Sequence, residues 1–218
     1  VPAYIWDVLK AMPKDSHPMV MLDTAILVMQ KESVFNKKYN EGIKKTEYLE
    51  PTLDDALNLL ARLPSIAAGI YRIKFNKGDI IPYDTSLDWG ANYAKMLGFN
   101  DEKFAKLMKL YLVLHCDHES GNVSQNACNT VSSALSDVYY SVSAGLNGLA
   151  GPLHGLANQE CLNFIIKIKE KFNGIPSDED LKKFCWDTLN GKMVIPGYGH
   201  AVLRVTDPRF TAFLNFGK

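Results

Sequence analysis

Apolar residues recur every three or four positions along most of the chain, which is the period of a helix with one buried face. Period-two alternation, which would indicate a strand, is almost absent. The fold class predicted is therefore all-α. The residue stretch 75–88 is the best candidate for a long loop. The helices expected from period and flanking residues span 3–11, 18–32, 53–75, 101–115, 137–150, 155–171, 178–190 and 209–218.

Residues that favour helix starts stand before several of these segments. Thr52 with Asp55 resembles a capping box, and Asn100 is placed to cap the following helix. Ser177 with Asp180 has the same spacing before the helix that ends near residue 190. Each pair can satisfy backbone N–H groups that a first helical turn leaves unpaired.

Three of the five histidines stand in glycine-rich settings: His118, His154 and His200. Glycine removes side-chain cover and lets the backbone turn sharply. An imidazole is the side chain best suited to moving a proton near neutral pH. The pattern predicts one polar acid–base pocket assembled from distant segments.

His154 gives the sharpest expectation because it directly precedes a predicted helix. The N–H groups and dipole of a helix start disfavour an imidazolium there. A histidine held neutral in this way can donate a hydrogen bond to a carbonyl and stabilise an enol. The alternative is a histidine that only helps to close the turn.

His118 lies between two carboxylates, and His115, Cys116 and His118 have a spacing compatible with a metal ion. However, no fourth ligand is close in sequence, and neither HExxH nor CxxC occurs. No metal site is therefore expected. The alternative for His118 is a helix-end histidine that favours the negative end of the dipole.

The segment 194–204 is first apolar, then glycine-rich, then basic. Such a backbone can lie flat against a ring, and Arg204 can reach a phosphate. Arg209 offers a planar fork that suits a carboxylate. The alternative is two surface arginines near the helix that Asp207 and Pro208 introduce.

Composition narrows the function classes. Lys+Arg and Asp+Glu are both 24 and no long charge block occurs, which argues against broad nucleic-acid binding. No apolar run approaches the roughly 20 residues of a membrane span. The four cysteines form no CxxC, which is typical of free thiols in a reducing compartment.

Four strings together resemble the citrate synthase family, most closely its eukaryotic mitochondrial type. They are residues 114–124, 147–160, 194–204 and 206–209, with weaker similarity over the whole chain. The resemblance implies condensation of acetyl-CoA with oxaloacetate, then thioester hydrolysis to citrate. It implies a homodimer in the mitochondrial matrix that needs no cofactor.

The resemblance also implies roles for individual residues. His154 would stabilise the acetyl-CoA enol, and His200 would bind and protonate the oxaloacetate carbonyl. His118 and Arg209 would bind oxaloacetate. The coenzyme A contacts would come from Val194, Ile195, Gly197, Tyr198, Arg204 and, where the family often has an arginine, Lys45.

By the same resemblance, the chain is an internal fragment that lacks the family's catalytic aspartate, and we expect the 218 residues alone to be inactive. Residues 1–154 would belong to the large helical domain and 155–218 to a truncated small domain. A methylcitrate synthase is the nearest alternative enzyme. A non-catalytic helical fragment or interaction module is the alternative from another class.

Overall fold

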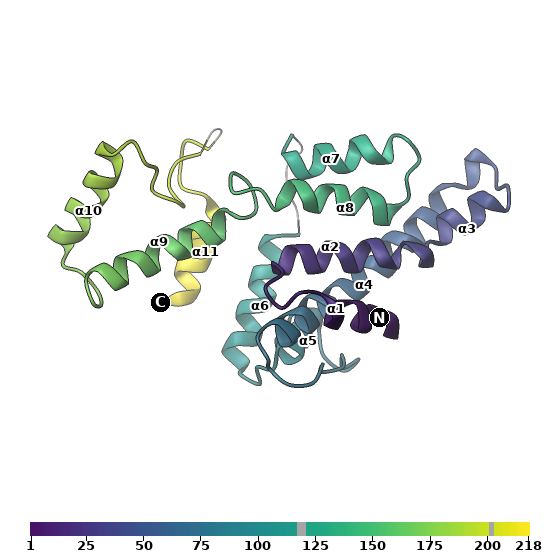
Figure 1. The fold of residues 1–218 in the computed structure, drawn as a ribbon, viewed down its shortest axis with the longest axis horizontal. Coiled ribbons are helices and arrows are strands. Elements are labelled where there is room, and N and C mark those ends of the chain that lie inside the picture. Colours follow the sequence, from purple (N-terminus) through teal and green to yellow (C-terminus); the bar gives the residue numbers. More distant parts are fainter. Residues whose placement is uncertain (117–120, 201–202) are drawn as a thin grey trace. The chain divides into compact units, whose positions relative to one another are not determined.

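The computed structural model describes residues 1–116, 121–200 and 203–218 (Figure 1). All regular structure in these three ranges is helical, which confirms the predicted all-α class. None of the helices in the described ranges is long and apolar enough to cross a bilayer. The elements are α1 (Ala3–Ala11), α2 (Pro18–Val28), η1 (Met29–Glu32), α3 (Val34–Asn40), η2 (Lys45–Glu47), α4 (Leu49–Lys74), α5 (Trp89–Leu97), α6 (Glu102–Leu114), α7 (Val123–Ser132), α8 (Val138–Leu149), α9 (Ala157–Lys171), α10 (Asp178–Asn190) and α11 (Pro208–Gly217).

The chain divides into two compact units. One comprises Val1–Gly148 with Phe213–Lys218, and the other comprises Leu149–Ala212. The assignment of residues 1–154 and 155–218 to a large and a small domain remains a prediction.

The core of the first unit is built by α1, α2, α4 and α8. Burial of apolar side chains is the main favourable term in folding, so this core holds the four helices together. Tyr139 is its largest fully buried side chain. The other buried core residues are Ile5, Leu9, Met21, Ala25, Ile26, Met29, Leu59, Ile66 and Ile70.

Asp55 connects α4 to the start of α3. Its carboxylate is fully buried and accepts hydrogen bonds from Ser33 Oγ at 2.6 Å, from the Val34 N–H at 2.7 Å and from the Phe35 N–H at 3.2 Å. The predicted capping box of Thr52 with Asp55 is therefore wrong. The helix begins earlier, at Leu49, and Thr52 Oγ1 donates to the Tyr48 carbonyl.

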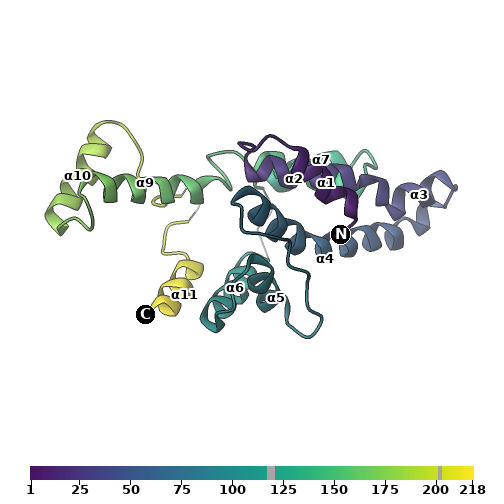
Figure 2. The same cartoon turned by 60° about the horizontal axis from the view of Figure 1, so that its bottom comes forward.

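Helices α5 and α6 lie side by side (Figure 2). Gly90 makes this close approach possible, because a methyl group added there would lie 2.7 Å from Lys109 Cα. The start of α6 differs by one residue from the prediction. Asp101, rather than Asn100, caps the helix by accepting from the Phe104 N–H at 2.7 Å.

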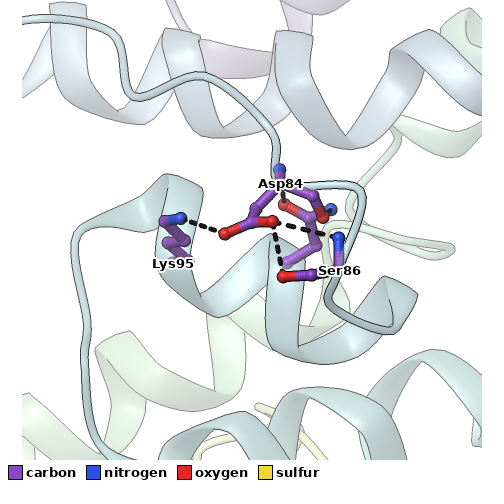
Figure 3. Close-up of polar contacts among 4 residues, drawn as sticks. Asp84, Ser86 and Lys95 are labelled. Carbon is purple, nitrogen blue, oxygen red and sulfur yellow. Dashed lines mark hydrogen bonds and ion pairs between the residues drawn. The ribbon is translucent and has the colours of Figure 1, made fainter.

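The predicted loop over residues 75–88 is confirmed, since these residues contain no helix or strand. Asp84 fixes its end against α5: one carboxylate oxygen pairs with Lys95 Nζ at 2.7 Å, and the other accepts from Ser86 Oγ (Figure 3). These hydrogen bonds hold the pKa of Asp84 well below its usual range, and the one from Lys95 has the largest effect.

The second unit contains the α9–α10 pair. Phe184 of α10 is buried against Phe164 and Phe172, with ring centroids 5.7 and 6.1 Å apart, and Lys171 Nζ lies 4.5 Å from its centroid. The predicted cap of α10 is confirmed, because Ser177 Oγ accepts from the Asp180 N–H at 3.2 Å. These contacts give α9 a fixed apolar side, and the turn that precedes α9 carries His154.

Candidate active site

His154 lies in the turn that leads into α9, as the sequence predicts. The backbone N–H of His154 donates to the Gly151 carbonyl at 3.0 Å, and the backbone carbonyl of His154 accepts from the Ala157 N–H at 3.1 Å. Gly155 is required by crowding, because a methyl group there would lie 2.7 Å from the Leu149 carbonyl oxygen. The half-buried His154 ring is therefore carried at a helix start on a tightly closed turn.

The glycine-rich segment forms a closed turn over residues 195–198. The Tyr198 N–H donates to the Ile195 carbonyl at 3.2 Å, and Gly197 has a φ of 88°. Proline at the second position and a positive-φ glycine at the third are the signature of a type II turn. Val194 precedes this turn and Tyr198 is its last residue. They are 76% and 83% exposed, so their side chains are available to a ligand.

His200 is held by the residues that follow it. Its Nδ1 accepts from the Leu203 N–H at 2.9 Å, and its carbonyl accepts from Arg204 Nη1 at 3.0 Å. A neutral ring with Nδ1 as acceptor carries its proton on Nε2. In a neutral His200 ring, the hydrogen bond from Leu203 therefore leaves Nε2–H as the donor.

Arg209 forms a bidentate pair with Asp207 in the structure. Arg209 Nε lies 3.0 Å from Asp207 Oδ1, and Nη2 lies 2.7 Å from Oδ2. This pairing, with a backbone hydrogen bond from Arg209, lowers the pKa of Asp207 below its usual value. Asp207 and Arg209 therefore form one hydrogen-bonded ion pair at the start of α11.

The structure brings some of the predicted residues together. His200 and Arg204 are in direct contact, and Arg209 pairs with Asp207 a few residues further along the chain. His154 belongs to the same compact unit, whereas the exposed Lys45 belongs to the other unit. His118 lies outside the described residues. Convergence of the three histidines on one pocket remains a prediction.

Two features of this region were missed from the sequence. The sequence predicts Asp207 only as a helix cap, although it also binds the Arg209 side chain. Two residues this far apart within a helix would not face each other, but Asp207 lies before the first residue of α11. The contact of Cys161 with Gly197 had no signal in sequence spacing, because it joins α9 to a loop.

Within the described ranges, no group of three or more histidine, cysteine, aspartate or glutamate side chains could hold a metal ion. All four cysteines there are free thiols. The groups able to do chemistry in the second unit are thus imidazoles, guanidinium groups, carboxylates and thiols.

The sequence matches known proteins over its whole length. The family model "Citrate synthase, C-terminal domain" matches residues 1–218. The chain is 51% identical over 216 residues to citrate synthase 4, mitochondrial, of Arabidopsis thaliana, covering 99% of this chain and 46% of that protein. It is 49% identical over 218 residues to 2-methylcitrate synthase, mitochondrial, of Yarrowia lipolytica, covering 99% of this chain and 47% of the relative.

Solved structures agree with these relatives. The structure of citrate synthase from Pyrobaculum aerophilum superposes with a TM-score of 0.84 at 28% identity, over 99% of this chain and 52% of the other. That from Thermotoga maritima gives 0.74 at 26% identity, over 98% and 51%. The chain spans about half the length of the proteins it matches. With a family model matched from the first residue to the last, this chain belongs to the citrate synthase family.

Proposed function

We propose that the whole protein condenses acetyl-CoA with oxaloacetate and hydrolyses the product to citrate and free coenzyme A, in the mitochondrial matrix and as a homodimer. The observation that carries this proposal is the family match over residues 1–218. The mitochondrial citrate synthases among its relatives, at 49–51% identity, support the reaction and the compartment.

The proposed reaction begins when a carboxylate removes a proton from the acetyl methyl group. His154 stabilises the resulting enol by donating a hydrogen bond to the thioester oxygen. No residue of this chain is assigned the role of that carboxylate.

The enol carbon then attacks the keto carbon of oxaloacetate, and the keto oxygen takes a proton from His200. The hydrogen bond from the Leu203 N–H supports this role, because it leaves the proton of a neutral His200 on Nε2. Water then cleaves the thioester of the citryl intermediate, giving citrate and the thiol of coenzyme A.

Arginines and the turn bind the two substrates in this proposal. Arg209 binds a carboxylate of oxaloacetate, together with His118. To do so, the Arg209 guanidinium leaves the Asp207 carboxylate and pairs with the substrate carboxylate instead. Coenzyme A lies against Val194, Ile195, Gly197 and Tyr198, with Arg204 and Lys45 at its phosphates. Each substrate and product is bound without a metal or redox cofactor.

A second candidate is methylcitrate synthesis from propionyl-CoA, favoured by the 49% identity to the 2-methylcitrate synthase of Yarrowia lipolytica. The two differ by one methylene on the acyl group, and such a difference is worth about 10- to 200-fold in specificity. Comparison of kcat/KM for the two thioesters decides between them.

The test of the main proposal is release of thiol from acetyl-CoA by the full-length protein, with and without oxaloacetate. We expect release that depends on oxaloacetate, and a fall in kcat of about 100-fold or more in His154→Ala with a nearly unchanged KM for oxaloacetate. A folded protein that releases no thiol, as expected of a non-catalytic helical module, would overturn the proposal.

A further inference from the structure

The turn over residues 195–198 rests on α9 through one close contact. A methyl group added at Gly197 would lie 3.0 Å from Cys161 Sγ and 3.9 Å from its Cβ. The Gly197 backbone thus packs directly on the Cys161 thiol. Cys161 is half-buried and Gly197 is exposed, so the contact lies at the surface of this unit rather than in its core.

The same helix carries His154 at its start. The His154 carbonyl accepts from the N–H of Ala157, the first residue of α9, and Cys161 follows little more than one turn later. Cys161 therefore lies on the helix that follows His154 and contacts the 195–198 turn, and the proposed function assigns both segments to the acyl-CoA substrate.

We propose that Cys161 is a positioning residue for the acyl-CoA substrate: its side-chain size sets the height of the 195–198 turn above α9, and with it the distance from the turn to His154. This inference rests on the proposed function and specifies how its coenzyme A site is held.

The turn moves as a unit when Cys161 changes size. The hydrogen bond from Tyr198 to Ile195 closes it, and Gly197 already occupies a positive φ that other residues rarely adopt. A larger side chain at position 161 cannot be relieved at Gly197, which has no side chain to move. The whole turn must shift, including the exposed Tyr198 at its end.

The first test compares variants of the full-length protein. We expect Cys161→Leu to raise the KM for acetyl-CoA roughly tenfold, with the KM for oxaloacetate within about twofold of its original value. Cys161→Ser, which fits the same space, should stay within about twofold for both substrates. The matched control is Cys185→Leu, which changes the half-buried thiol of α10 in the same unit.

A thioester that lacks the nucleotide of coenzyme A distinguishes a shifted turn from a smaller amount of folded protein, because only a shifted turn affects the two thioesters differently. Acetyl-N-acetylcysteamine lacks the part of coenzyme A that the turn would hold, so Cys161→Leu should use it as well as the unchanged protein does. An equal loss with both thioesters, or an unchanged KM for acetyl-CoA, would overturn the inference. If the unchanged protein releases no thiol, the proposed function is itself wrong. If the unchanged protein releases thiol but Cys161→Leu has the same KM for acetyl-CoA, the inference alone fails.

A reversible modification covers the case in which Cys161→Leu does not fold. In a full-length protein with the other described cysteines, Cys116, Cys128 and Cys185, changed to serine, methyl methanethiolsulfonate converts the Cys161 thiolate to a methyl disulfide and releases methanesulfinate. We expect the KM for acetyl-CoA to rise roughly tenfold and to return after reduction with dithiothreitol. A fully modified protein with an unchanged KM would contradict the positioning role.

Discussion

The Nδ1 atom of His200 accepts a hydrogen bond from the backbone N–H of Leu203 at 2.9 Å. This contact ties the ring to the segment that also carries Arg204, whose Nη1 binds the His200 carbonyl. Because Nδ1 is used as an acceptor, a neutral ring presents a proton at Nε2. The hydrogen bond from Leu203 thus sets the orientation of the His200 ring and the tautomer of its neutral form.

His200→Ala should lower kcat by about 100- to 10,000-fold, the range typical of losing a positioned proton donor. Steady-state rates of thiol release measure the effect. The control is His17→Asn: His17 caps α2 through Nδ1 and the Met19 N–H at 3.1 Å, and asparagine is also a good cap. Equal rates in His200→Ala and the unchanged protein would exclude His200 as the proton donor.

Arg209→Ala should raise the KM for oxaloacetate about 10- to 100-fold, because a bidentate contact with a substrate carboxylate is lost. The folded state should change little, because the Arg209–Asp207 pair is exposed and such pairs add little stability. Lys106→Ala, which breaks the exposed pair with Glu102, is the matched control. A KM that changes equally in both variants would argue against substrate contact by Arg209.

Asp207 should titrate below the usual carboxyl pKa of about 3.9. Its pKa is lowered by the hydrogen bonds from Arg209, so the folded protein binds fewer protons here than the unfolded chain in acid. Any stability from this group is complete above the unfolded pKa and is lost as the pH falls through the folded value. Carbon-detected NMR should follow the titration, and Arg209→Ala should return the pKa toward its usual value; no change in that variant would contradict the assigned cause.

Local sequence patterns predicted the boundaries that local interactions decide. Helix α1 spans the predicted residues. Ser177 caps α10 as predicted, because this cap depends on groups three residues apart. The helices α3, α5 and α7 were not predicted. The role of Asp55 was mistaken because its partners lie 20 to 22 residues away, across a tertiary contact that no local pattern encodes.

The candidate site shows the same division. The turn at Pro196 and Gly197 and the exposed helix start after His154 follow from residue chemistry at fixed spacing. The pairing of Arg209 with Asp207 and the packing of Gly197 on Cys161 depend on three-dimensional proximity. The sequence therefore predicted the reactive and binding side chains better than the residues that hold them in place.

Asp55→Ala should destabilise the first unit by about 2–4 kcal/mol, because it leaves buried donors at Ser33, Val34 and Phe35 without an acceptor. Amide hydrogen exchange of Val34 and Phe35 should accelerate correspondingly. Asp54→Ala, at the neighbouring exposed position, is the control and should stay within about 0.5 kcal/mol. Unchanged protection of both amides in Asp55→Ala would show that the buried carboxylate does not hold the start of α3.

The most direct measurement identifies the product. The full-length protein is incubated with oxaloacetate and acetyl-CoA labelled with carbon-13 in the methyl group, and the products are followed by NMR. Carbon–carbon bond formation predicts that the label appears in a methylene carbon of citrate, in equal amount to the coenzyme A released. Labelled acetate in place of citrate would show simple thioester hydrolysis and would contradict the proposed condensation.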